Sequence, residues 1–171
     1  MKTLFTIGDS FTYGSELDDV RNAWPHLLGK SLGYTVDNYA KPGASNDYMV
    51  RTTVEYLDTH TPNLVIIAWT TPDRLELNGK HCTPHTSPTL FRDWDTAWAS
   101  SKYHTQVKLI DSYITVPHLF CSAWDEPLSS NSYVGRLVEW SYGTPHGPGG
   151  HPLEQGHQRI ADEILKHILR S

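Results

Sequence analysis

The sequence predicts a single α/β domain in which a parallel β-sheet lies between two layers of helices. Short apolar runs typical of buried strands alternate along the chain with longer segments that carry apolar residues at helical spacing. Strands that alternate with helices imply parallel crossovers, so helices cover both faces of the sheet. The chain has 171 residues, of which 38% are hydrophobic, which suits one domain core and is short for two. We therefore expect one three-layer α/β/α domain over residues 1–171.

Each element of this sandwich is predicted from its own pattern of apolar residues. Four short apolar runs are expected to be strands: residues 4–7, 35–39, 64–69 and 116–122. Helical spacing predicts helices at 23–32, which Gly33 ends as a C-cap, at 46–57, within 101–113 and at 153–169. The segment 78–95 is polar and rich in Pro, Thr and His, and we expect an irregular excursion that overhangs the carboxyl end of the sheet.

The composition excludes several classes of function. A formal net charge of -5 gives no basic surface, so nucleic acid is not expected as a partner. Cys82 and Cys121 match no zinc or redox spacing, so we expect two free thiols, no metal site and no cofactor. The first strand leaves no room for a signal peptide, and no apolar run approaches the ~20 residues of a membrane span. We expect a soluble cytoplasmic protein without a membrane partner; no particular oligomeric state is indicated.

The first expected strand runs into Gly8, Asp9 and Ser10, which places Ser10 where open α/β sheets bind ligands. A serine hydroxyl becomes a nucleophile when a histidine within hydrogen-bond reach accepts its proton. His151 precedes the last expected helix, and it returns to this edge if that helix packs beside the first strand. The competing interpretation is that Ser10 caps a helix starting near Thr12. Asp9 is expected to accept backbone N–H groups in the turn.

Four blocks of the sequence resemble the conserved blocks of the SGNH (GDSL-type) hydrolase family. They are "IGDSFTYG" after the first strand, "NYAKPGASND" after the second, "AWTTPDR" at the end of the third, and "GGHPLEQGHQRIADEI" ahead of the last helix. The resemblance spans the chain in the family's order, and it implies a flavodoxin-like sheet of about five strands. It also implies a serine esterase with Ser10 as nucleophile, His151 as base, and the backbone N–H groups of Ser10 and Gly43 in the oxyanion hole.

Two of these blocks depart from the family pattern. The third lacks the family's asparagine, so Thr70 or Thr71 is left as a hydroxyl donor, and we place Thr71 in the oxyanion hole. The fourth has Pro148 three residues before His151, where the family has its aspartate. A backbone carbonyl can also hold an imidazole in one tautomer, so we expect a Ser10–His151 dyad. Candidates for the orienting partner are His146, Asp73 and Asp125.

Residues beside these blocks indicate the substrate. Trp69 and Trp124 follow strands and are expected at the rim of the cleft, where aromatic faces suit a sugar ring or a flat acyl group. Arg74 is a candidate for an anionic substrate group. Asn46 either faces the site or caps the helix that begins there. We expect hydrolysis of a small acyl ester, such as an O-acetyl group on a carbohydrate.

Two other functions remain open on the sequence. The same nucleophile, in a site that admits a hydroxyl acceptor, makes an acyltransferase. Loss of the family's asparagine and aspartate also suits a catalytically inactive glycan-binding module. The short chain and the departures in blocks three and four are compatible with a bacteriophage or other viral member of the family.

Overall fold

A five-stranded parallel sheet forms the centre of the computed structural model, which describes residues 1–124 and 128–170. The strand order is β2-β1-β3-β6-β7, and each neighbouring pair is parallel. The strands are β1 (Thr3–Gly8), β2 (Thr35–Asn38), β3 (Leu64–Trp69), β6 (His118–Ser122) and β7 (Tyr133–Arg136). Every residue of the central β3 is buried, because helices cover both faces of the sheet.

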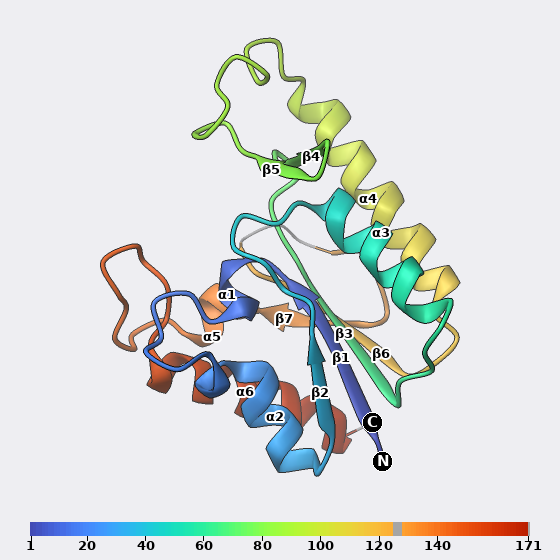
Figure 1. Cartoon of the computed structure of the whole chain (residues 1–171), viewed down its shortest axis with the longest axis vertical. Helices are drawn as coiled ribbons and strands as arrows, with labels where there is room; N and C mark the ends of the chain where they lie inside the picture. Colours follow the sequence, from blue (N-terminus) through green and yellow to red (C-terminus); the bar gives the residue numbers. More distant parts are fainter. Residues whose placement is uncertain (125–127, 171) are drawn as a thin grey trace.

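Two helices pack on each face of the sheet (Figure 1). The face covered by α3 (Asn46–Leu57) and α4 (Thr96–Tyr113) holds one core cluster, which includes Phe5, Trp69 and Tyr103. The opposite face, covered by α2 (Trp24–Leu32) and α6 (Glu154–Arg170), holds a second cluster. The shorter helices are η1 (Val20–Asn22), α1 (Ser10–Tyr13) and α5 (Leu137–Trp140). The predicted three-layer α/β/α sandwich is therefore confirmed.

The strand order reverses direction at the carboxyl ends of β1 and β3, which is where open α/β sheets bind ligands. From β1 the chain moves to one side for β2 and then across to the other side for β3. In open α/β sheets such a reversal separates the two crossover loops and leaves a crevice between them. The segments after β1, β2 and β3 are those that carry the first three sequence blocks.

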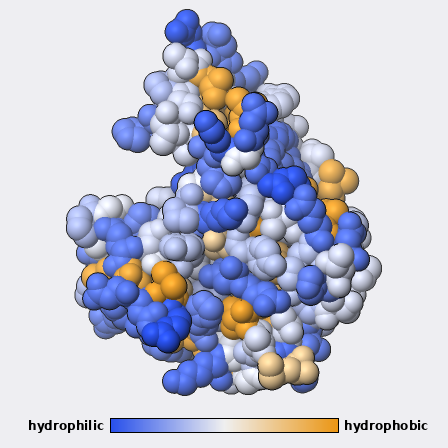
Figure 2. All heavy atoms as spheres, in the orientation of Figure 1, coloured by the Kyte–Doolittle hydropathy of each residue, from blue (hydrophilic) through white to orange (hydrophobic). Residues whose placement is uncertain are grey.

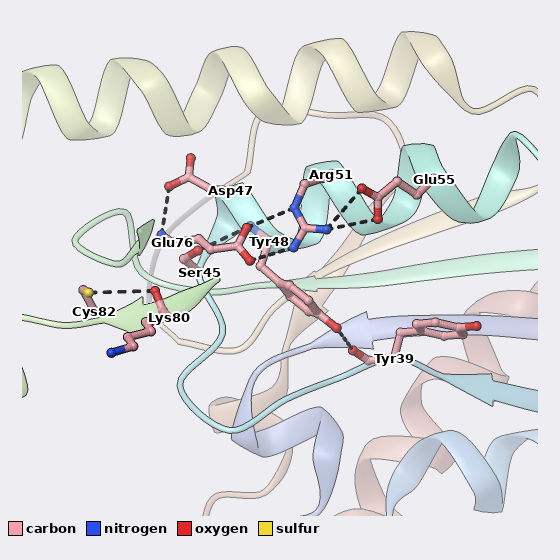
Figure 3. Close-up of polar contacts among 9 residues, drawn as sticks. All are labelled: Tyr39, Ser45, Asp47, Tyr48, Arg51, Glu55, Glu76, Lys80 and Cys82. Carbon is pink, nitrogen blue, oxygen red and sulfur yellow. Dashed lines mark hydrogen bonds and ion pairs between the residues drawn. The ribbon is translucent and has the colours of Figure 1, made fainter. Parts of the chain in front are cut away.

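An arm, residues 75–95, projects beyond this edge of the sheet (Figure 1). It begins with a hairpin of β4 (Leu75–Leu77) and β5 (Lys80–Cys82), so the expectation of a wholly irregular excursion is wrong for β5. The Arg51 guanidinium on α3 bonds both Glu76 oxygens, at 3.1 and 2.6 Å, and also bonds Glu55 (Figure 3). This bidentate pair fixes the base of the arm to α3.

Other elements agree with the predictions except at their ends. The strand at 64–69 and the helix at 46–57 have the predicted bounds. Helix α4 begins earlier than expected because the Asp95 side chain accepts from Trp98 N at 2.9 Å and caps it.

Cys82 and Cys121 are both free and buried. In the described part of the chain, no helix has the length and apolar character needed to cross a membrane.

Candidate active site

Ser10 is the first residue of α1, directly after the turn that ends β1. The cap of this helix is Asp9, whose Oδ1 accepts from Phe11 N at 3.1 Å. Gly8 lets α1 pack closely against the end of β1, because a Cβ there would lie 2.3 Å from Thr12 Oγ1. Ser10 therefore does not serve as the helix cap, and its hydroxyl makes no hydrogen bond within residues 1–124 and 128–170.

Asp9 is a fully buried carboxylate that joins the ends of three strands. Its Oδ2 accepts from Thr70 Oγ1 at 2.8 Å, from Trp124 Nε1 at 3.0 Å and from Arg74 at 3.2 Å. The predicted structural role of Asp9 is confirmed. These bonds also employ the Thr70 hydroxyl and one Arg74 nitrogen, so Thr70 is not placed to donate elsewhere and Arg74 is partly neutralised.

Two backbone amides and one hydroxyl stand at the carboxyl ends of β1, β2 and β3. Gly43 has a φ of 73°, which favours glycine. Among the hydrogen bonds of the described residues, none uses the N–H of Ser10 or of Gly43. The half-buried Thr71 hydroxyl likewise has no partner in that part of the chain. These three groups are the donors that the sequence assigns to the oxyanion hole.

Asn46 is buried and clamps the end of β3. Its Nδ2 donates to Thr70 O at 3.0 Å and to Thr71 O at 3.3 Å, while its Oδ1 accepts from Thr70 N at 3.0 Å. Ser45, not Asn46, caps α3 by accepting from Tyr48 N. The side chain of Asn46 is thus committed to the backbone beside Thr71 rather than to helix capping or to an open site.

His151 lies beside the segment that carries Ser10. The His151 imidazole centroid is 5.7 Å from the ring of Phe11, the residue after Ser10. Its Nδ1 lies 2.7 Å from Glu16 Oε2, and Gly149 N donates to Glu16 Oε1 at 2.7 Å. The Gly149 amide, the His151 imidazole and the His151 amide lower the pKa of the Glu16 carboxyl. A carboxylate only accepts, so Nδ1 carries the proton and Nε2 is left as the basic nitrogen.

The second histidine of this block is structural. His157 is fully buried and its Nδ1 accepts from Trp24 N at 3.2 Å, which ties α6 to α2. Burial lowers the pKa of His157 to about 4, and the nearby His151 acts in the same direction. His157 is therefore neutral around pH 7.

Some predicted site residues lie elsewhere. Trp69 is fully buried, and its side chain points to the face of the sheet that α3 and α4 cover, where it packs edge-on to Tyr103 and Phe120. The prediction that Trp69 lines the rim of the cleft is therefore wrong. Trp124 is half-buried and contacts Phe11 with ring centroids 5.0 Å apart. His146 Nδ1 is 2.7 Å from Thr144 O, and His151 Nδ1 is instead paired with Glu16. Asp125 lies outside the described residues.

Glu16 is the residue that the sequence interpretation missed. The sequence carries one indirect signal for it: Pro148 stands where the resembled family has an acid, so a partner for His151 has to come from another part of the chain. No group of three His, Cys, Asp or Glu side chains in residues 1–124 and 128–170 is arranged to hold a metal ion.

Known structures share this architecture over the whole chain. TesA superimposes with a TM-score of 0.68 at 17% identity, over 98% of both chains. The psychrotrophic esterase EstA from Pseudoalteromonas sp. gives 0.64 at 13% identity, over 99% of this chain and 98% of that one. A family two carbohydrate esterase from Clostridium thermocellum, in complex with cellohexaose, gives 0.66 at 16%, over 99% of this chain and 64% of that one. No protein-family model and no curated protein sequence matches.

Further structures with the same architecture include G-D-S-L lipolytic proteins from Desulfitobacterium hafniense and Veillonella parvula. In this chain, the Gly8-Asp9-Ser10 motif joins the end of β1 to the start of α1, and His151 lies in the loop directly before α6. The chain therefore has the fold of the SGNH (GDSL-type) hydrolases.

Proposed function

We propose that the protein is a serine esterase that hydrolyses small acyl esters. The observation that carries this proposal is that His151, whose Nδ1 is held by a carboxylate, lies against Phe11, the residue next to Ser10, whose hydroxyl has no partner in the described residues. In the described residues Ser10 and His151 are not hydrogen-bonded, and such bonds often tighten only when substrate binds. The comparisons support the fold, and esterases are among the structures that share it.

The reaction follows from the roles of these groups. Ser10 Oγ attacks the acyl carbonyl carbon while His151 Nε2 takes the hydroxyl proton. The resulting oxyanion is stabilised by the N–H groups of Ser10 and Gly43 and by the Thr71 hydroxyl. His151 then returns the proton to the leaving alkoxide, which departs as an alcohol. A water molecule attacks the acyl-serine by the same steps, releasing the carboxylic acid and restoring Ser10.

We further propose that the ester is an O-acyl group on a carbohydrate. The molecule is indented between the arm and the lobe that carries residues 143–151, and α1 lies between these two parts (Figures 1 and 2). A cavity of about 250 Å³ is lined by Pro72 and Asp73, the two residues after Thr71, and by Trp94, among others. An aromatic face beside a carboxylate suits the apolar face and the hydroxyl groups of a sugar.

The proposal is tested with p-nitrophenyl acetate, butyrate and octanoate, and with an acetylated oligosaccharide. We expect turnover of the short acyl esters, release of acetate from the sugar, and loss of at least about 10³-fold in kcat for Ser10→Ala. Ser15→Ala, in the same loop, is the matched control and is expected to retain activity. No turnover of any ester would contradict the esterase assignment. Transfer of acetyl to an added sugar acceptor, faster than to water, would identify an acyltransferase instead.

A further inference from the structure

Glu16 is held in an unusual setting for a loop glutamate. It has a φ of 70°, a left-handed conformation that is uncommon for residues other than glycine. Its side chain is 22% exposed, and its two oxygens meet three groups of one loop. Gly149 N donates to Oε1 at 2.7 Å, His151 N donates to Oε2 at 3.1 Å, and His151 Nδ1 lies 2.7 Å from the same Oε2.

The loop before His151 is built around this carboxylate. A Cβ on Gly147 would lie 2.6 Å from Glu16 Cδ, and a Cβ on Gly149 would lie 2.9 Å from Glu16 Oε2. Neither position has room for a side chain while the carboxylate is present. The bond from Gly147 N to His151 O, at 2.9 Å, closes the loop on itself. Gly147 and Gly149 of the "HGPGGH" segment thus make space for an acid that comes from another part of the chain.

We propose that Glu16 is the positioning residue of the catalytic histidine, replacing an acid at position 148. This inference rests on the proposed esterase function. Glu16 fixes the His151 tautomer with the proton on Nδ1, leaves Nε2 as the base toward Ser10, and stabilises the imidazolium that forms after proton transfer. The nucleophile and the group that orients its base then belong to one short segment, Ser10 to Glu16. Movement of the histidine loop relative to Ser10 is restrained by the same bonds.

Glu16→Gln tests the proposal because it keeps the size of the side chain and removes the charge. An amide has one acceptor oxygen and cannot hold Gly149 N, His151 N and His151 Nδ1 together. We expect kcat to fall by about 10²-fold with KM changed less than about threefold, since Glu16 does not touch substrate. The control is Glu163→Gln, which removes a surface ion pair with Lys166 and is expected to leave both constants unchanged.

A second measurement needs no variant of Glu16. In protein labelled with ¹⁵N-histidine, the His151 signals are identified by their loss in His151→Asn. We expect the neutral His151 imidazole of the wild-type protein to carry its proton on Nδ1 and none on Nε2. An Nε2-protonated tautomer, or a Glu16→Gln variant with wild-type kcat, would overturn the proposal. If the wild-type protein hydrolyses no ester, the proposed function fails instead.

Discussion

Trp124 Nε1 donates to Asp9 Oδ2 at 3.0 Å, and this bond links the segment after β6 to the end of β1 across the intervening β3. Thr70, at the end of β3, donates to the same oxygen. One buried carboxylate therefore holds the carboxyl ends of three neighbouring strands, directly beside Ser10. We therefore expect this carboxylate to stabilise the edge of the sheet that carries the site.

Asp9→Asn should destabilise the protein strongly. The amide nitrogen or the single oxygen cannot serve all the donors that meet at Oδ2, and the site is fully buried. We expect the free energy of unfolding to fall by about 2–3 kcal/mol, measured by urea denaturation. Asp162→Asn, on the surface of α6, is the control and should change it by less than about 0.5 kcal/mol. An Asp9→Asn variant as stable as the control would refute the structural role.

The contribution of the Thr71 hydroxyl to the oxyanion hole can be tested by replacing that one group. Thr71→Val replaces the hydroxyl with a methyl group of similar shape, whereas Thr71→Ser keeps the donor. If the hydroxyl binds the oxyanion, kcat should fall by about 10²-fold in Thr71→Val, with little change in KM, and stay near wild type in Thr71→Ser. Steady-state kinetics on p-nitrophenyl acetate measure both. Equal activity of the two variants would remove Thr71 from the hole.

The base of the arm offers a matched pair of glutamates, because Arg51 bonds both Glu76 on the arm and Glu55 on its own helix (Figure 3). Glu76→Gln should loosen the arm, and Glu55→Gln should not. The expected readout is faster limited proteolysis within residues 78–95 and a higher KM for an acetylated oligosaccharide in Glu76→Gln alone. Similar cleavage rates in the two variants would show that the ion pair does not hold the arm.

The free energy of unfolding should fall as the pH is lowered from about 6.5 to about 4. Burial lowers the pKa of His157 to about 4 from an ordinary value of 6.5, so the unfolded chain binds more protons than the folded chain between these limits. The loss attributable to His157 is about 3 kcal/mol. Burial lowers the pKa of His26 and His81 too, which acts in the same direction.

Urea denaturation at several pH values, in wild type and in His157→Gln, separates the contribution of His157. The variant should begin less stable at pH 7, because glutamine fits the Trp24 N–H less well, and should lose less stability on acidification. A variant with the wild-type pH dependence would show that His157 does not titrate in this range.

The sequence predicted the layers, four strands and the positions of Ser10 and His151, because apolar periodicity and turn residues act locally. It missed β7, whose four residues include Gly135 and lack a continuous apolar run. It also placed Trp69 at the rim, since alternation along a strand buried on both faces does not show which side a residue takes. Glu16 was missed for a different reason: its partner lies 135 residues away, and only the folded chain brings them together.

The assignment of Ser10 as nucleophile is tested most directly by mass spectrometry after incubation with a fluorophosphonate ester, which traps activated serines covalently. We expect one adduct per chain, mapped to the peptide containing Ser10, retained in Ser15→Ala and absent in Ser10→Ala. An unlabelled wild-type protein, or an adduct that persists in Ser10→Ala, would contradict it.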